Sequence, residues 1–528
     1  MNLRKLTFSL IFISLIIALL PACRQRQGGN QFVIAISDKI LTLDTLMTPT
    51  VDAGSERLRQ MIFNSLVRKN ERFEYVGELA DKIDTSADGL TVTFTLHDGV
   101  TFHDGRPLTS ADAKYTLDTL LASSSAKAAS FYEGAGDARK PFITGTDAPD
   151  AHTLVIHLRR PWVQLMVNLV PINIIPTDSI GTQKDKPIGS GPFKFKSFDA
   201  TQQVAELEAN PNYWEGAPKI QNIRVRVITD ASPLQAELRS GTIQIAPNAS
   251  NLTPDALNAL AQDPNLKVEQ FKGANVVYLG FNVTKAPISD ARVRQAICYA
   301  IDRETIIHDL LLGQARIAHS ILPEESWAYS AGQVYTYDPE KAKQLLDQAG
   351  FRDPDGDGPQ MRFKEPLVLR ISTSAATRQY AGVIQDYLKR VGIPLEIESL
   401  ENATITDQQI KGDYQMMSRV SVGGNQDPVF LKDLFATSGI PTADHTGFNR
   451  TRYSNPELDP ILEEAANTAE RDKAKSLYGK AQEIISRDVP MFPLWYPNIM
   501  VPASRKVGGI QVKGDGDWAF TRNLTLEK

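Results

Sequence analysis

The sequence predicts an α/β protein, because strand patterns and helix patterns alternate along nearly its whole length. Thr91–Leu96 alternates strictly between threonines and apolar residues, which is typical of a strand with one buried face. Val276–Phe281 is a second strand pattern, and between Val293 and Ile301 apolar residues recur every three or four positions, as on one helix face. Short connections and the lack of an internal repeat favour sheets covered on both faces by helices.

Local signals predict where several helices begin and end. We expect Thr109 to cap a helix, with Asp112 completing a capping box three residues later. Ser232 is expected to cap another helix, since the proline that follows it suits the first helical position. The last long helix is predicted at Arg471–Asp488, where Pro490 stops it.

The N-terminal residues are typical of an export signal. Two basic residues precede an uncharged apolar run, Leu6–Leu20, that is shorter than the roughly 20 residues needed to span a membrane. The run ends in Leu20-Pro21-Ala22-Cys23, which resembles a bacterial lipobox. We expect residues 1–22 to be a signal peptide, Cys23 to carry a membrane-anchoring lipid and residues 23–30 to be a tether. An ordinary signal peptide or an uncleaved anchor is the alternative; either way the protein is extracytoplasmic, in the periplasm or on the outer face of the cell membrane.

Charge and cysteine content exclude other classes. The formal net charge is −5, and lysine and arginine form no concentrated run. Nucleic-acid binding needs such a basic footprint, so no nucleic-acid partner is expected. Cys298 has no cysteine left to pair with once Cys23 carries a lipid, so we expect a small buried side chain and no disulfide.

A search for catalytic motifs finds none that is complete. Gly189-Ser190-Gly191-Pro192 lacks the spacing of a nucleophile elbow, and Ser124-Ser125-Ala126-Lys127 lacks the elements that accompany Ser-x-x-Lys in β-lactamases. There is no phosphate loop, dinucleotide fingerprint or His-Glu-x-x-His. We therefore expect a protein that is not an enzyme and needs no cofactor.

One acidic stretch resembles the start of a calcium loop. Asp353, Asp355 and Asp357 alternate and are followed by glycine, as in a loop that offers carboxylates to Ca²⁺. The bidentate acid of such a loop should fall at position twelve, which is Lys364 here. The stretch is therefore either a structural calcium site or an acidic solvent-facing turn.

Several blocks together resemble one family, the peptide and nickel solute-binding proteins (family 5) of ATP-binding-cassette importers, which include oligopeptide- and dipeptide-binding lipoproteins. The blocks follow the family's order and cover nearly the whole chain after the signal. They are Gly77–Ala80, Asp88–Thr91, Leu96–Gly105, Thr109–Asp112, Pro187–Phe195, Asn210–Trp214, Arg292–Ile297, Ala300–Arg303, Tyr453–Asp459 and Pro490–Leu494.

The resemblance implies a two-lobed fold like the periplasmic binding proteins (type II, cluster C), with a small subdomain inserted in the first lobe. The expected first lobe comprises residues 31–71, 189–272 and 494–528, the insert residues 72–188, and the second lobe residues 273–493. Such lobes close on a solute about a hinge and then dock on the membrane subunits of the importer. The resemblance implies a monomer that binds a peptide; oligosaccharides, opines and nickel chelates are the other solutes, and an enzyme or a signalling receptor on this fold is the remote alternative.

The sequence of one loop in the second lobe does not determine which solute is bound. In peptide-binding relatives an aspartate three residues before an acid-Pro pair binds the peptide's amine. Asp427-Pro428 matches that pair, so the amine-binding position falls on Gly424, and the family's tryptophan falls on Ser421. This favours a blocked or longer peptide, or a non-peptide solute, with Asn425 and Asp427 as the remaining polar candidates.

The other binding candidates come from segments that line the cleft in relatives. Arg378 opens the helix where dipeptide-binding relatives place a carboxylate-binding arginine, which suits bidentate recognition, although a solvated arginine is the alternative. The candidates near the two hinge crossovers could instead serve only to pack the protein interior, without contacting a ligand. The set comprises Thr48, Thr50 and Asp52 after the first strand, Asn275, Tyr278 and Asn282 near one crossover, and Trp495 at the other.

Overall fold

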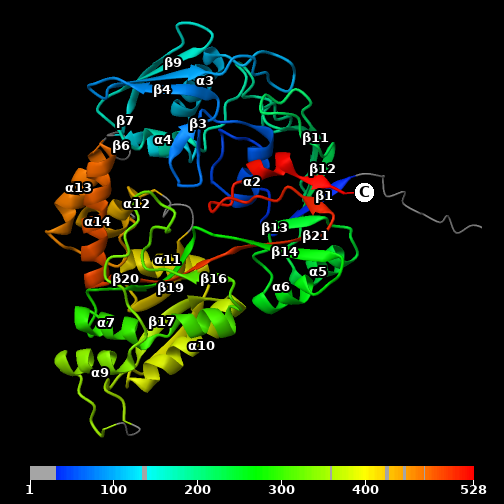
Figure 1. Cartoon of the computed structure of the whole chain (residues 1–528). Coiled ribbons are helices and arrows are strands. Elements are labelled where there is room, and N and C mark those ends of the chain that lie inside the picture. Colours follow the sequence, from blue (N-terminus) through cyan, green and yellow to red (C-terminus); the bar gives the residue numbers. More distant parts are fainter. Residues whose placement is uncertain are drawn as a thin grey trace, which may run out of the picture.

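The chain folds into two lobes, each built on a mixed sheet, and the first lobe carries a smaller subdomain (Figure 1). The predicted α/β fold is confirmed. The computed structural model describes residues 31–133, 139–356, 360–421, 427–443, 447–468 and 470–527. Within these residues, none of the helices combines the length and apolarity that a membrane crossing needs.

The first lobe is built on a seven-stranded sheet. Its strands, in spatial order, are β10 (Phe193–Asp199), β11 (Val204–Ala209), β12 (Asn222–Val227), β1 (Phe32–Ile36), β13 (Ile245–Asn248), β21 (Ile499–Ser504) and β14 (Leu266–Phe271). Its helices are α2 (Ala53–Ile62), α5 (Ala231–Arg239) and α6 (Pro254–Ala261). β1 is buried along its whole length because alternate residues enter two different cores, as the sequence pattern of a central parallel strand requires.

The inserted subdomain shares a core with the first lobe, since Phe94 and Leu117 pack in the same apolar cluster as Ile34 of β1. Its four-stranded sheet has the order β4 (Ala80–Thr85), β5 (Thr91–Leu96), β9 (Thr153–Leu158), β8 (Ile143–Asp147). Its other elements are α3 (Ser110–Leu121), α4 (Leu165–Leu169) and the pair β6 (Tyr132–Glu133) and β7 (Lys140–Pro141). The hairpin of β2 (Val67–Lys69) and β3 (Tyr75–Gly77) is the part of the first lobe that leads into the subdomain. The capping box expected at Thr109 and Asp112 is present.

The second lobe is built on a six-stranded sheet with helices on both faces. Its strands are β16 (Ala315–Ile317), β20 (Met491–Pro497), β15 (Val276–Phe281), β19 (Met416–Ser421), β17 (Leu367–Ser372) and β18 (Leu395–Leu400). Its helices are α7 (Ala291–Ala300), α8 (Arg303–Thr305), α9 (Pro339–Gln348), α10 (Ala375–Arg390), α11 (Asn402–Lys411), α12 (Phe430–Phe435), α13 (Leu458–Asn467) and α14 (Arg471–Asp488). Cys298 on α7 is buried, as expected, and burial raises the pKa of its thiol.

Two sequence expectations concern helix ends. The helix predicted at Arg471–Asp488 is confirmed at both ends. The cap expected at Ser232 is wrong, because α5 starts earlier with Asp230 as its N-cap residue. Pro233 is tolerated there because the first turn of a helix has no carbonyl for its N–H groups to bond.

The two lobes are joined by a pair of chain crossings that we call the hinge, residues 272–275 and Asn498. β14 leads into β15 through the first crossing, and β20 leads into β21 through the second. On each side of the hinge these strands pair antiparallel with each other, with Phe271 opposite Ile499 and Val277 opposite Trp495. A Cβ on Gly273 would lie 2.1 Å from the carbonyl oxygen of Pro497, so the two crossings are in backbone contact. The second sheet extends through Pro497, so the expected boundary between residues 493 and 494 falls within β20.

Two of the sequence blocks meet where the subdomain joins the first sheet. Gly189 and Gly191 press against the end of α2, where a Cβ would lie 2.1 and 2.5 Å from backbone atoms of Ile62. His103 lies beside them: its Nδ1 accepts from the N–H of Gly189 at 3.3 Å, and its Nε2 lies 3.1 Å from the carbonyl oxygen of Gly191. Both contacts suit the neutral imidazole, and burial lowers the pKa of His103 to about 4.

We predict that His103 makes the protein less stable as the pH falls from 6.5 to 4. The unfolded chain binds a proton near the ordinary histidine pKa of 6.5, whereas the folded chain binds it only near 4, so protonation favours unfolding within this window. The loss is up to ~3 kcal/mol. Urea unfolding across this pH range checks it: His103→Gln should flatten the decline, and the exposed His308→Gln should not. An unchanged decline in His103→Gln would contradict the assignment.

Candidate ligand-binding site between the lobes

Opposite the hinge, the hairpin β2–β3 reaches from the first lobe to the second (Figure 1). The hydroxyl of Tyr75 donates to the Asp427 carboxylate, and Glu74 pairs with Arg471 of α14 at 2.5 Å. Asp427 also accepts the N–H of Val429 at 2.9 Å, just before α12. We call Glu74, Tyr75, Asp427 and Arg471 the clasp. The lobes therefore contact each other at two separate places, the hinge and the clasp.

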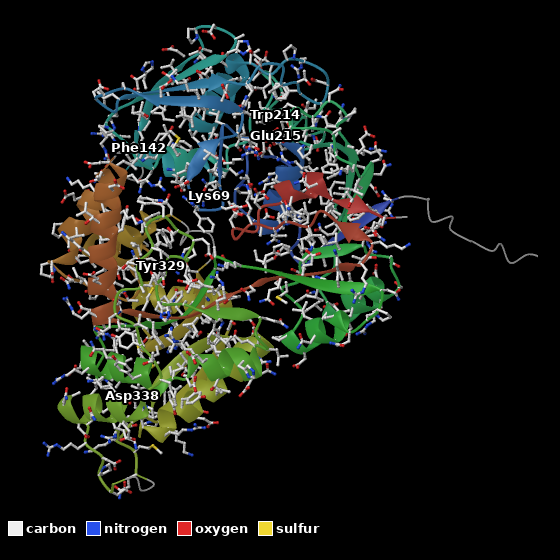
Figure 2. The ribbon with its side chains drawn as sticks, viewed as in Figure 1. Lys69, Phe142, Trp214, Glu215, Tyr329 and Asp338 are labelled. Carbon is white, nitrogen blue, oxygen red and sulfur yellow. The ribbon has the colours of Figure 1, made fainter. Side chains whose placement is uncertain are left out.

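The clasp is electrostatically coupled to buried charges of the first lobe. Burial raises the pKa of Tyr75, and the negative charge of Asp427 raises it further, so the phenol stays protonated and donates. Lys69 lies on the same hairpin, between the lobes in Figure 2. Burial lowers its pKa, against the charges of Asp515 and Asp427. Asp427 therefore already interacts with the first lobe, which the expectation of a ligand-binding role did not include.

A pocket of about 170 Å³ lies in the second lobe beside the clasp, between the sheet and α12. Two of the expected binding residues, Tyr278 and Ser421, line it. Two arginines, Arg419 and Arg450, line it as well, and its other walls are mostly apolar. The full lining consists of Tyr278, Ile321, Gln409, Met417, Arg419, Val420, Ser421, Phe430, Leu434, Phe448, Arg450 and Met491.

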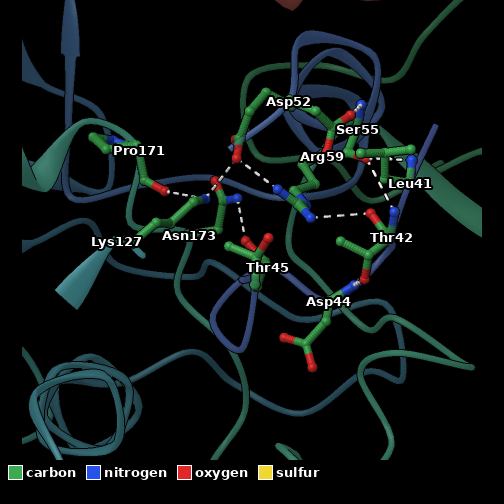
Figure 3. A network of polar contacts seen from close by, with 12 residues as sticks. Leu41, Thr42, Asp44, Thr45, Asp52, Ser55, Arg59, Lys127, Pro171 and Asn173 are labelled. Atoms are coloured by element: carbon green, nitrogen blue, oxygen red, sulfur yellow. Dashed lines mark hydrogen bonds and ion pairs between the residues drawn. The ribbon is translucent and has the colours of Figure 1, made fainter. Parts of the chain in front are cut away.

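The loop expected to line the cleft from the first lobe lies over a buried polar network (Figure 3). Thr48 is buried, and its carbonyl accepts the N–H of Ala126 at 2.9 Å. Thr50 is exposed, with its carbonyl bonded to the Thr48 hydroxyl. Asp52 caps α2 by accepting from Ser55 N–H at 2.8 Å, while its other carboxylate oxygen is buried and has no partner among the described residues. Thr48 and Asp52 therefore have structural contacts, and Thr50 is the accessible member.

The base of this network is an ion-pair cluster. Glu56 pairs with Arg59 at 2.5 Å and with Lys127 at 2.9 Å, and both cations are almost fully buried. Lys127 also donates to the carbonyl of Pro171 at 2.8 Å, which ties the subdomain to α2. Burial lowers the pKa of Lys127 against the opposing charge of Glu56. This cluster fixes the position of the loop.

The candidates on and beside the two hinge strands, β15 and β20, divide into packing and pocket residues. Asn282 is fully buried and donates to the carbonyls of Gly412 and Tyr414, both at 3.0 Å, so it ties the end of β15 to the loop between α11 and β19. Trp495 is 2% exposed and packs edge-on against Tyr380 at 5.1 Å between ring centres. Asn275 lies half-buried in the hinge.

The remaining expected residues lie apart from the pocket or outside the described residues. Arg378 is exposed at the start of α10 and donates to the carbonyl of Thr373. Gly424 and Asn425 lie outside the described residues, as does Cys23 with the whole predicted signal and tether.

The acidic stretch forms a turn in its described part. Asp353 accepts the N–H groups of Asp355 and Gly356, and its carboxylate lies 3.7 Å from Arg362. Asp357 lies outside the described residues, and those that are described contain no group of three side chains placed to hold a metal. A structural calcium at this stretch stays a prediction.

The sequence did not identify three residues that the structure places at the site: Tyr75, Arg419 and Arg450. Arg419 could have been found, since on the strand it faces the same side as Ser421 and lies opposite Tyr278. Tyr75 and Arg450 are brought to the site by chain folding over long sequence separations, which leaves no local signal.

Comparison with known proteins gives consistent results. The model for the middle region of the bacterial extracellular solute-binding proteins, family 5, matches residues 74–441. The oligopeptide-binding protein AppA of Bacillus subtilis is 27% identical over 497 residues, covering 90% of this chain and 88% of that protein. Heme-binding protein A of Haemophilus influenzae is 27% identical over 549 residues, covering 96% of each. The structure of AppA with a nonapeptide matches with a TM-score of 0.71 and 25% identity, over 94% of this chain and 99% of that one.

We predict that Tyr75→Phe opens the unliganded protein, because it removes the hydrogen bond that the first lobe donates to Asp427. Small-angle scattering should show a larger radius of gyration for this variant, while the free energy of unfolding falls by no more than about 1–3 kcal/mol. Tyr132→Phe is the matched control, since its hydroxyl bonds to Leu121 inside the subdomain. Equal radii for Tyr75→Phe and the wild type would show that the clasp does not hold the lobes together.

Proposed function

The chain belongs to the bacterial extracellular solute-binding proteins of family 5, and from this premise we propose that it captures a peptide between its lobes and delivers it to an ATP-binding-cassette importer. The observation that carries the proposal is the pairing of a two-strand hinge with a clasp on the opposite side of the cleft. A solute that contacts both lobes stabilises the closed form, and this differential affinity is what drives closure.

Relatives and geometry both support a peptide as the cargo. AppA is named for oligopeptide binding and has been solved with a nonapeptide. Extended peptides are held mainly through main-chain hydrogen bonds, with pockets for individual side chains. The pocket beside the clasp is of a size for one such group, not for a whole solute. Binding and release without turnover complete the role, because recognition and closure need no bond-breaking group.

The proposal includes a lipid on Cys23 and a monomeric receptor. A tether of a few polar residues keeps the receptor near the membrane and raises its effective concentration at the importer.

We predict that Cys23→Ala moves the protein from the membrane fraction to the soluble fraction when it is expressed in a bacterial host. The proposed lipid is attached through the Cys23 thiol, ahead of the folded domain, so the thermal unfolding of that domain should be unchanged. A variant that stays with the membrane would disprove the lipid anchor without touching the solute-binding role.

A second candidate cargo is a non-peptide solute that carries carboxylates, such as a tetrapyrrole, an opine or a metal chelate. The observation that favours it is the pair Arg419 and Arg450 in one pocket. The similarity to heme-binding protein A over 96% of both chains is consistent with it.

We predict that the protein purified from its own host carries a peptide that native mass spectrometry detects. Adding a binding peptide at a hundredfold excess over its dissociation constant should stabilise the fold by about 2.7 kcal/mol, measured as a higher melting temperature. A mixture of acetylated sugars is the control. If such sugars or metal chelates stabilise the protein and peptide pools do not, the peptide assignment is wrong.

A further inference from the structure

The second-lobe half of the clasp is backed by a buried tyrosine. Tyr478 on α14 is 1% exposed and packs in the same apolar cluster as Leu431 and Phe435 of α12. Its ring lies edge-on to the ring of Trp327, with 6.0 Å between the ring centres. The guanidinium of Arg471, a clasp residue, lies over the same Trp327 ring at 4.3 Å. Tyr478 therefore belongs to the packed group that supports the clasp.

The hydroxyl of Tyr478 is buried and has no hydrogen-bond partner among the described residues. Other buried tyrosines of this lobe use their hydroxyls: Tyr453 donates to the carboxylate of Asp488 at 2.5 Å, and Tyr496 donates to the carbonyl of Ser320 at 2.7 Å. A buried hydroxyl that bonds to nothing costs free energy, because it has given up its bonds to water. The form seen here therefore carries an unsatisfied donor beside the clasp.

Two carboxylates act on this hydroxyl, and one of them belongs to the clasp. Burial raises the pKa of Tyr478, and the charges of Asp427 and Asp433 raise it further. Asp427 directly precedes α12, and both of its carboxylate oxygens are engaged: one accepts from the Tyr75 hydroxyl and the other from the N–H of Val429 at 2.9 Å. Asp427 is thus within electrostatic reach of two tyrosines, one on each lobe, and bonds to the one on the first lobe.

Opening of the cleft changes the partners available to Asp427. Tyr75 moves away with the first lobe, so the carboxylate of Asp427 loses a hydrogen bond. Tyr478 is carried by the same lobe as Asp427 and stays within reach of its charge. A hydroxyl bonds to a carboxylate more strongly than to a neutral acceptor. The open form therefore combines a buried donor without a partner and an acceptor that has lost its donor.

We propose that Asp427 exchanges hydrogen-bond donors as the cleft opens, accepting from Tyr75 of the first lobe in the closed form and from Tyr478 of the second lobe in the open form. Tyr478 is then a positioning residue that stabilises the open form and is left unsatisfied in the closed form. The clasp can hold the lobes together without locking them. The exchange occurs in the unliganded protein and does not depend on which solute is captured.

Distances between the lobes of the unliganded protein test the exchange. Spin labels at the exposed positions Lys82→Cys in β4 and Lys411→Cys in α11 give the proportions of closed and open molecules by pulsed electron resonance. Each variant is measured in the otherwise unchanged protein and together with Glu74→Gln, which weakens the other clasp contact, to Arg471. The two backgrounds keep the ratio of closed to open molecules measurable whichever form predominates.

Tyr478→Phe should raise the ratio of closed to open molecules about fivefold, because it removes a bond of the open form and an unsatisfied donor of the closed form. Tyr75→Phe should lower the ratio by a similar factor. The double variant should match Tyr75→Phe alone, since without the Tyr75 hydroxyl Tyr478 donates to Asp427 in both forms. Tyr453→Phe is the matched control: it loses a bond to Asp488 within one lobe, so the ratio should not change.

The exchange is overturned if Tyr478→Phe leaves the ratio unchanged in both backgrounds or shifts it toward the open form. Asp427→Ala identifies the acceptor, because in this variant Tyr478→Phe should have no further effect. If Tyr478→Phe still closes the lobes there, Asp433 is the partner of the hydroxyl and the exchange is wrong. Urea unfolding provides a second measurement: a larger loss of stability in Tyr478→Phe than in Tyr453→Phe would show that the hydroxyl is bonded in the closed form, which also contradicts the exchange.

Discussion

The contact between the two chain crossings of the hinge is the constraint on which the arrangement of the lobes depends. β14 and β15 run alongside β20 and β21, so one pair of antiparallel strands passes through both sheets and is interrupted only at residues 272–275 and Asn498. Gly273 lets the two backbones touch, and Arg316 donates to its carbonyl at 3.1 Å. Two adjacent crossings leave rotation about the hinge as the soft motion, so the cleft must open on the side of the clasp.

The clasp is weak enough for a ligand to decide the equilibrium. The Glu74–Arg471 pair is partly exposed, and such pairs contribute about 0–1 kcal/mol. The bond from Tyr75 to Asp427 involves a charged acceptor, which adds roughly 1.5–3 kcal/mol. Together the two contacts contribute a few kcal/mol to closure. This is comparable with the stabilisation by a solute present at a hundredfold excess over its dissociation constant. The clasp therefore biases the lobes toward closure, and the solute completes it.

Much of the fold can be predicted from the local sequence, whereas less of the candidate site can. Thr91–Leu96, Val276–Phe281 and Arg471–Asp488 match β5, β15 and α14 because each pattern has the period of its element and a clear end signal. The site is different. Arg450 reaches the pocket through long-range folding, and Asn282 was expected at the cleft although its amide bonds to the buried loop between α11 and β19. Polar residues near a hinge can serve either role, and only their partners decide between them.

The most direct test of closure about this hinge is the distance between the lobes. Spin labels at Lys82→Cys in β4 and Lys411→Cys in α11, both exposed, report it through pulsed electron resonance, with buried Cys298 left unlabelled. The account predicts that a bound peptide shifts a broad distance distribution to a shorter, narrower one. A distribution that stays the same when calorimetry shows the peptide bound would contradict it.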